Sequence, residues 1–270
     1  MERGTYASLS YAKTHLSIAD ALDDTRLACL LESASRTFDR DCGRFFYTAT
    51  RTLTFTARQY DALLVPDLLS VTALHTDDGT RTYPYAWAAT DYELVASDSE
   101  PDRYPRWQVV TTPTSPQAFP VGLRRGVRIV GLWGHGDGES ASPWTASGAT
   151  ITLATDSATS ATVSSGTPFS VGQTLLAESE QLYVTGVLGV TLTVERGVNG
   201  TTAAAHNAVA ASIARYPSGV VDATLARAEI DLRIPITGVS GGGDIGTVTT
   251  GPAYARYRGI VEQYRLAGVA

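Results

Sequence analysis

One long tract of this chain carries almost no charge. Between residues 139 and 214 there are five acidic side chains and one basic one, and the other residues are mostly Ser, Thr, Ala, Gly and Val. When these are set aside from the 27 acidic and 21 basic residues of the 270-residue chain, 22 acidic and 20 basic residues remain in the flanks. A composition that changes twice predicts a separate module inserted into a different fold.

Inside this tract, short alternating segments are separated by Gly and Ser turns. Four of them, at residues 150–153, 173–176, 181–185 and 190–194, have the polar and apolar alternation of strands. Short strands at this spacing are typical of a compact β-barrel or β-sandwich, here about 70 residues long and near the lower limit for independent folding.

The flanks contain helical patterns. Between Asp23 and Gly43, apolar residues recur every three or four positions, which predicts an amphipathic helix that ends at the glycine: Leu27, Leu30, Leu31, Ala34, Phe38 and Cys42. A shorter helix is expected before it, and residues 17–20 resemble a capping box. Residues 219–234 form a third helical pattern, and Pro252 opens a last helix that extends to Leu266.

Between residues 45 and 133 the period changes toward two. Residues 51–56, 70–75, 91–95 and 127–132 predict strands of a small antiparallel sheet, with proline-rich loops between them. The fold class is therefore α+β: a small helical bundle with an antiparallel β-sheet, plus an inserted all-β barrel or sandwich-like domain. The predicted division is a discontinuous core of residues 1–138 and 215–270 and an inserted domain of residues 139–214.

Charge and hydropathy exclude several classes of protein. The net charge of −6 argues against a general nucleic-acid binder, which presents a basic face to phosphate. The chain has no run of 18 apolar residues and no apolar stretch after a basic start, so neither a membrane span nor a secretory signal is expected. Cys29 and Cys42 fall on one predicted helix about 20 Å apart, too far to pair, which favours a reducing compartment.

The most site-like side chain is His135, which lies among glycines beside Asp137. Glycines admit a ligand and a carboxylate can orient an imidazole, so a hydrolase built on this pair is one hypothesis. Glycines at the end of a strand more often mark a turn, and this second interpretation is favoured. No further His lies at metal-ligand spacing.

Other candidate sites are weaker still. Asp98, Glu100 and Asp102 alternate like calcium ligands, but Pro101 interrupts them and an exposed acidic loop is expected. Residues 241–243 are three glycines without the Lys-Ser/Thr of a phosphate-binding loop, and they indicate a flexible hinge. Cys29 lies on a helix without a histidine partner in sequence. The sequence therefore predicts no catalytic residue, no metal, no cofactor and no enzyme.

Several flanking segments resemble a known family. Residues 9–18 (LSYAKTHLSI) are similar to its opening Leu-x-x-Ala-Lys-x-His-Leu segment, and residues 23–44 to its helix ending in Gly-Arg. Residues 65–71 with Asp78-Gly79 resemble its next strand pair, and residues 127–136 its last strand. The chain thus resembles the head–tail connector family, also called adaptor or head-completion proteins, of long-tailed double-stranded-DNA phages.

The resemblance differs at one place. In the family a Pro-led helix follows the last strand almost at once, whereas here it is delayed to residues 217–221 by the uncharged tract. Within that tract, residues 195–206 (ERGVNGTTAAAH) resemble a β-module of several phage structural proteins.

What the resemblance implies is a structural protein of the virion neck, assembled in the host cytoplasm. It implies a ring of twelve subunits beneath the portal, which joins capsid to tail and lines the channel through which double-stranded DNA passes without sequence-specific binding. The expected partners are the portal protein, a stopper or tail-completion protein and further copies of the chain. The alternative is an accessory virion module that recognises host-surface glycan through the β-insertion, although Trp144, Phe169 and Tyr183 are few aromatics for stacking on sugar.

The last helix is the predicted interface with the portal or a neighbouring subunit. Tyr and Arg side chains anchor many interfaces, and the helix follows a glycine-rich tether. We expect it to dock away from the chain's own core. The candidate interface residues are Tyr254, Arg256, Tyr257, Arg258, Val261, Tyr264 and Arg265.

Overall fold

The computed structural model describes residues 2–96, 103–233 and 251–266. Its helices are α1 (Leu9–Leu16), α2 (Asp24–Cys42), α3 (Ser218–Arg233) and α4 (Gly251–Tyr264). The Ser8 side chain accepts a hydrogen bond from the Tyr11 N–H and caps α1, while Gly43 ends α2 in the left-handed conformation (φ 69°). Ser17, expected in a capping box, instead ends α1 as a left-handed C-cap, because the chain turns there before α2.

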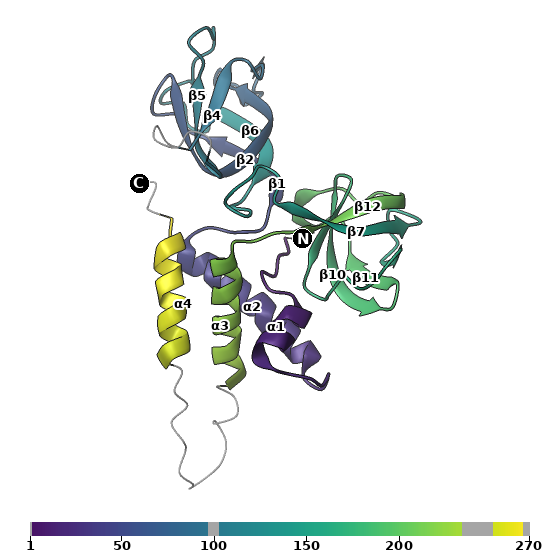
Figure 1. The fold of residues 1–270 in the computed structure, drawn as a ribbon. Helices are drawn as coiled ribbons and strands as arrows, with labels where there is room; N and C mark the ends of the chain where they lie inside the picture. Colours follow the sequence, from purple (N-terminus) through teal and green to yellow (C-terminus); the bar gives the residue numbers. More distant parts are fainter. Residues whose placement is uncertain (1, 97–102, 234–250, 267–270) are drawn as a thin grey trace. The chain divides into compact units, whose positions relative to one another are not determined.

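The helices come from both ends of the chain and pack together (Figure 1). Leu27, Leu31 and Ala34 of α2 lie in one core with Leu225 and Ala228 of α3 and residues of the N-terminal segment. The apolar stripe expected on α2 is confirmed, because all of its members are buried except the half-buried Leu30. Sequence-distant segments therefore close one helical core.

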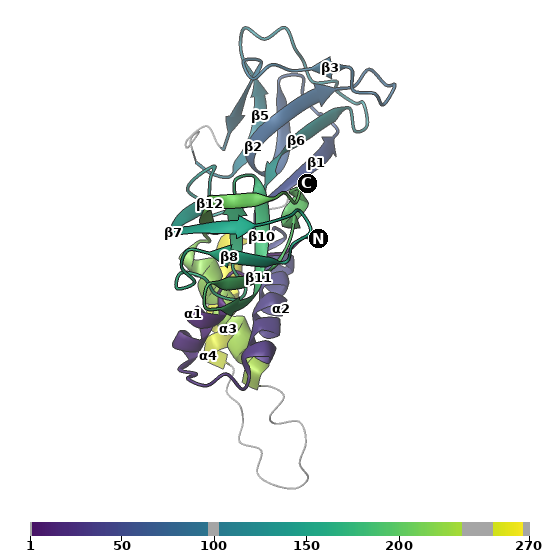
Figure 2. The same cartoon turned by 90° about the vertical axis from the view of Figure 1, so that its right-hand side faces the viewer.

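The middle of the chain forms an antiparallel sheet. Its strands are β1 (Ala49–Phe55), β2 (Ala62–Thr76), β3 (Tyr85–Ala86), β4 (Tyr92–Val95), β5 (Arg106–Thr111) and β6 (Val127–Trp133). They follow the order β1-β6-β2-β5-β4, with β3 paired to β2 (Figure 2). A Cβ atom on Gly131 would lie 2.3 Å from the Ser70 carbonyl oxygen, so only glycine permits β6 to approach the bulged part of β2.

The uncharged tract forms a closed barrel. Its strands are β7 (Trp144–Leu153), β8 (Ser160–Val163), β9 (Thr174–Ala177), β10 (Glu180–Leu188), β11 (Thr191–Glu195) and β12 (His206–Ala214), in the order β10-β11-β8-β7-β12-β9. Aliphatic residues such as Ile151, Leu175 and Leu192 fill its interior. Closure leaves no strand edge unpaired, which explains how a module without charged edge residues avoids edge-to-edge association.

The fold is thus α+β with an inserted barrel, but its contacts divide the chain differently from the sequence-based prediction. Of the described residues, 2–47, 144–233 and 251–266 belong to one compact unit and 48–96 and 103–143 to the other, so the barrel groups with the helices and the sheet forms a unit of its own. The N-terminal segment explains the first grouping. Arg3 forms an ion pair with Glu195, the hydroxyls of Thr5 and Tyr183 lie 2.7 Å apart, and the Leu9 N–H donates to the Val171 carbonyl. That residues 139–214 fold autonomously remains a prediction.

Candidate functional sites

Helix α4, the predicted interface, packs on its own chain. Tyr257 is 1% exposed; its ring meets Phe38 edge-on with centroids 6.0 Å apart, and its hydroxyl donates to the Asp41 carboxylate at 2.7 Å. Val261 is also buried, and half-buried Tyr264 meets Phe38 and Phe46. The expectation that α4 stays off its own core is therefore wrong, because the apolar face of the helix completes the aromatic core beside α2.

An exposed flank of α4, beside the buried face, carries most of the other candidate residues. Tyr254, Arg258 and Arg265 are exposed, and the last two contact Glu262 in surface ion pairs of 3.7 and 3.5 Å. Exposed pairs of this kind contribute little to stability, so these side chains are available to a partner. Arg256 is exposed too, but two of its guanidinium nitrogens, Nε and Nη2, donate to the Asp222 carboxylate of α3.

The His135 and Asp137 pair lies in a turn after β6. One carboxylate oxygen of Asp137 accepts the N–H groups of Glu139 and Ser140, at 3.0 and 2.9 Å. A Cβ on Gly138 would lie 2.8 Å from the His135 ring, so the imidazole covers this turn closely. These contacts are those of a capped turn. A catalytic role for either residue has no support in this geometry.

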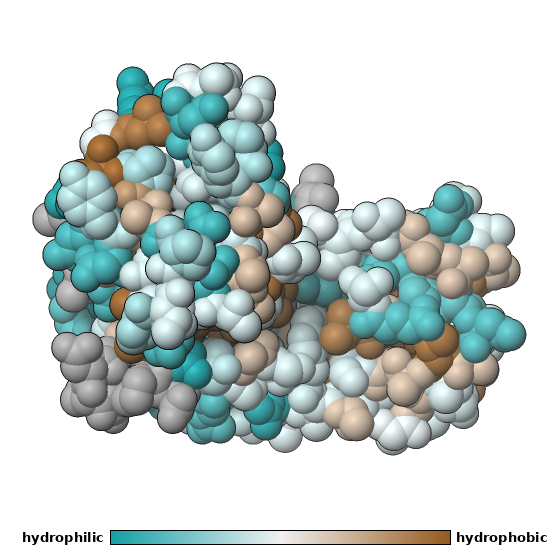
Figure 3. Space-filling model, turned by 90° about the horizontal axis from the view of Figure 1, so that it is seen from above, coloured by the Kyte–Doolittle hydropathy of each residue, from teal (hydrophilic) through white to brown (hydrophobic). Residues whose placement is uncertain are grey.

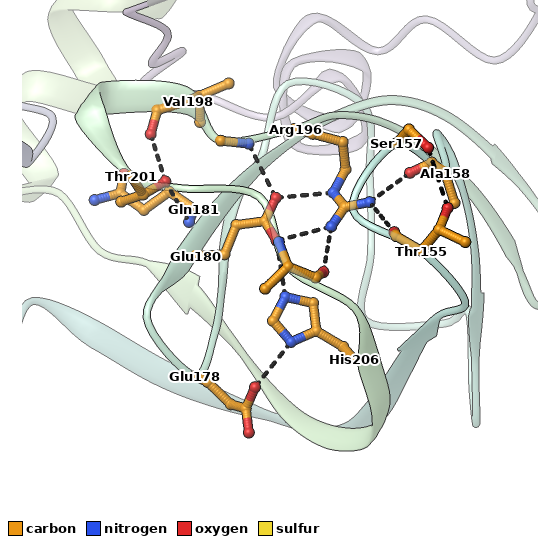
Figure 4. Close-up of polar contacts among 12 residues, drawn as sticks. Thr155, Ser157, Ala158, Glu178, Glu180, Gln181, Arg196, Val198, Thr201 and His206 are labelled. Atoms are coloured by element: carbon orange, nitrogen blue, oxygen red, sulfur yellow. Dashed lines mark hydrogen bonds and ion pairs between the residues drawn. The ribbon is translucent and has the colours of Figure 1, made fainter.

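The most elaborate polar site was not predicted, and it lies inside the barrel (Figure 4). The carboxylate of Glu180, fully buried at the start of β10, accepts two hydrogen bonds from Arg196, both at 2.8 Å. It also accepts the N–H groups of Gly197 and Ala204, and the Nε2 atom of His206 lies 2.8 Å from it. The other imidazole nitrogen lies 2.9 Å from Glu178.

This network stabilises the charged form of Glu180. Burial has the largest single influence and would raise the pKa of the carboxyl, but the hydrogen bonds from Arg196, Ala204, His206 and Gly197 outweigh it and lower the pKa to about 2. Arg196 also donates to the carbonyls of Thr155 and Ala158 and thereby joins three segments of the barrel. The site has its polar groups satisfied internally and acts as a structural cross-link.

The sequence did contain a signal for this network. The segment from Glu195 to His206 resembles a β-module of phage structural proteins, and it supplies both Arg196 and His206. Gly197 and Asn199 adopt left-handed conformations (φ 56° and 58°), which turn the chain back so that Arg196 points at Glu180. The single basic residue of an otherwise acidic or neutral tract is the one that a buried carboxylate requires.

A groove of about 670 Å³ lies between the N-terminal segment, α1, α3 and the barrel. Its lining includes Tyr6, Tyr11, His15, Thr174 and Tyr216. Elsewhere on the surface, the face drawn in Figure 3 is mostly hydrophilic or neutral, and hydrophobic residues interrupt it in separate places. That face therefore presents no large apolar patch to mark a docking site.

The remaining sequence features concern metal ligands, membrane spans, two loops and the cysteines. The described residues contain no group of three side chains suited to a metal, and none of their helices is long and apolar enough to cross a membrane. The acidic segment with Asp98, Glu100 and Asp102, and the glycines at 241–243, lie outside the described residues. Cys29 and Cys42 are free thiols, the first exposed and the second buried.

Two of the three barrel aromatics are unavailable for glycan stacking. Phe169 and Tyr183 are each 6% exposed, and the Tyr183 hydroxyl bonds Thr5. Trp144 alone is half-buried. Because sugar recognition by stacking needs an exposed aromatic face, the barrel gives the glycan alternative little support.

Comparisons with known proteins give a structural likeness but no likeness in sequence. No family model matches the chain, and no curated protein matches it. Among solved structures, a chain from "Neck of empty GTA particle computed with C6 symmetry" is similar, with a TM-score of 0.45 and 14% sequence identity over 99% of this chain and 93% of that chain. A likeness of this size carries no argument about function.

Proposed function

We propose that this protein is a structural head-to-tail adaptor of a phage virion. In this role it forms a ring beneath the portal, surrounds the passing DNA and joins capsid to tail in the virion neck. The residues that support the proposal are the flanking segments at 9–18, 23–44 and 127–136, which resemble the connector family. The number of subunits in the ring, and the portal and stopper proteins as its binding partners, belong to this proposal.

The observation that carries the proposal is the assembly of one helical core from the two ends of the chain. The connector-like segments at residues 9–18 and 23–44 form α1 and α2, and α3 packs against both across more than 170 intervening residues. The family resemblance requires this closure, since it treats the uncharged tract as an insertion before the Pro-led helix. Pro217 directly precedes α3, and the Val220 N–H donates to its carbonyl.

The exposed face of α4 is the proposed contact with the portal or a neighbouring subunit. Tyr254 is 47% exposed, and Arg258 and Arg265 lie close to it on the exposed flank of the helix. A rigid tyrosine with two forked cations is a combination that often anchors an interface. Because α4 is held by its own core, the surface is preorganised and binding does not have to order the helix.

The test is co-assembly with the portal protein encoded in the same genome, followed by light scattering and electron microscopy. The triple change Tyr254→Ser, Arg258→Glu and Arg265→Glu should abolish co-assembly while the far-UV circular dichroism stays unchanged. Arg40→Glu is the matched control, because the Arg40 side chain is 75% exposed on α2. Unchanged co-assembly of the triple variant would remove α4 from the interface, and no association of the wild-type chain with portals would contradict the function itself.

A further inference from the structure

Four arginines gather on two turns of the sheet unit. Arg81 follows β2, Arg124 and Arg125 precede β6, and Arg128 is the second residue of β6. The Arg81 guanidinium donates to the main-chain carbonyls of Arg124 and Arg125, which ties the two turns together. The Tyr83 hydroxyl donates to the same Arg125 carbonyl at 2.8 Å, and the Arg128 guanidinium lies 4.7 Å from the centre of the Tyr83 ring. We call these four residues the arginine cluster.

The cluster is not neutralised by nearby acids. Within residues 2–96, 103–233 and 251–266, none of its four guanidiniums forms an ion pair with a carboxylate. The two closest acids in sequence are engaged elsewhere: Asp77 accepts the N–H groups of Gly79, Arg81 and Tyr83, and Asp78 accepts from Thr80. On the helices the pattern is opposite, since Arg227 and Arg256 each bind an aspartate in two places.

The backbone of these turns is also unusual. Seven non-glycine residues of the described chain have positive φ, and three of them lie in or beside the cluster: Arg81 (68°), Tyr83 (54°) and Arg125 (55°). Left-handed conformations are unfavourable for such residues and persist where the surroundings enforce them, often at binding sites. The carboxylate of Asp77 enforces the first turn through its three N–H contacts. Unpaired positive charges are therefore held in place at a cost in energy.

A bound anion would neutralise the positive charges of the arginine cluster. Guanidinium groups present forked donors that match phosphate oxygens, and Arg124 and Arg125 are exposed on the turn. The neighbouring turn residues Asp78, Gly79 and Thr80 are exposed and polar or small. Most protein–DNA hydrogen bonds go to phosphate and sugar rather than to bases.

We propose that the arginine cluster binds the phosphate backbone of double-stranded DNA without reading its sequence. The net charge of −6 predicts that the rest of the chain repels DNA, so contact is confined to this local patch. The proposal rests on residues of the sheet unit alone and requires no ring. It is compatible with the proposed adaptor function, in which DNA passes close to the protein, but can hold or fail independently of it.

The experiment measures binding of a fluorescent duplex of arbitrary sequence to the full chain by anisotropy as salt is raised. Four phosphate contacts should give a slope of log K against log salt of about −3.6, so the affinity should fall about 150-fold between about 50 and 200 mM salt. Arg124→Gln with Arg125→Gln should weaken binding and reduce the magnitude of the slope by about 2. The control, Arg40→Gln, removes an exposed helical charge outside both proposed binding surfaces and should change neither.

Three results would overturn the proposal. One is the absence of binding by the folded wild-type chain at low salt, and another is an equal loss of affinity in the helical control. The third is displacement of DNA by polyglutamate at equal charge concentration, which would assign the cluster to an acidic protein surface instead. Circular dichroism of each variant shows that the sheet unit is folded, and a second duplex of unrelated sequence should bind with the same affinity.

Discussion

Replacing Arg196 with methionine should destabilise the barrel strongly. Methionine keeps much of the side-chain volume but removes the charge and all donors, leaving the fully buried Glu180 carboxylate without its two strongest hydrogen bonds. The carbonyls of Thr155 and Ala158 lose their donors as well. Breaking one partner of a buried ion pair costs about 3–5 kcal/mol.

A pH titration of the wild-type barrel should report the same interaction. Although burial opposes it, the hydrogen bonds from Arg196 and its neighbours lower the pKa of Glu180 from its ordinary value of 4.5 to about 2. A depressed carboxyl pKa contributes stability that is present above pH 4.5 and is lost as the pH falls toward 2. At about 1.36 kcal/mol per unit, the contribution is about 3 kcal/mol, which agrees with the lower end of the range for breaking the pair.

Hydrogen exchange is the appropriate assay, since the amides of Gly197 and Ala204 donate directly to the Glu180 carboxylate. In Arg196→Met their exchange should accelerate about 150- to 5,000-fold, corresponding to about 3–5 kcal/mol of lost local stability. Glu180→Gln with Arg196→Met should recover part of this loss, because it leaves no unpaired buried charge. An increase below about fivefold in Arg196→Met, similar to that of the exposed control Arg40→Ala, would refute the reasoning.

Three further predictions follow from the packing. Tyr257→Ala should lower the unfolding free energy of the helical core by about 3–5 kcal/mol in urea titrations, whereas Tyr254→Ala should change it by less than about 0.5 kcal/mol; equal effects would contradict the burial of Tyr257. Burial raises the pKa of Asp39 to about 7 against the opposing influence of Arg36. The stability that the protonated Asp39 carboxyl contributes is therefore present below pH 3.8 and is lost as the pH rises through 7. Asp39→Asn should remove this decline from a plot of unfolding free energy against pH. Replacing residues 139–214 with a Gly/Ser linker should leave a remainder that unfolds cooperatively, and a gradual calorimetric transition would contradict the prediction that the tract folds autonomously.

Local patterns predicted the elements well. The stripe from Leu27 to Cys42 becomes the buried face of α2, and the four strands expected in the uncharged tract coincide with barrel strands, two of them starting one residue early. β8 and β12 were not predicted, because residues 160–163 and 206–214 are rich in Ala and Ser and have weak alternation in hydropathy. Their strand conformation comes from pairing with β7, β9 and β11.

Features that depend on contacts between residues far apart in the sequence could not be predicted from local patterns. The contact of Arg3 with Glu195 spans 192 positions, and nothing in either local segment indicates it, so the grouping of barrel and helices could not be predicted. The Tyr and Arg pattern of α4 was assigned wholly to an interface, whereas Tyr257 and Val261 close the core against α2. A stripe of tyrosines is equally suited to a core or an interface, and only the position of Phe38 and Asp41 beneath it distinguishes the two.

Electron microscopy of the purified full chain, alone and with the portal protein of the same genome, tests most directly whether copies of this chain form a closed ring in a virion neck. We expect ring-shaped particles with a central hole wide enough for duplex DNA, seated on the portal, with helical density from α1 to α4 in each repeating unit. Single copies of 28.6 kDa under both conditions, or open filaments without closure, would contradict it.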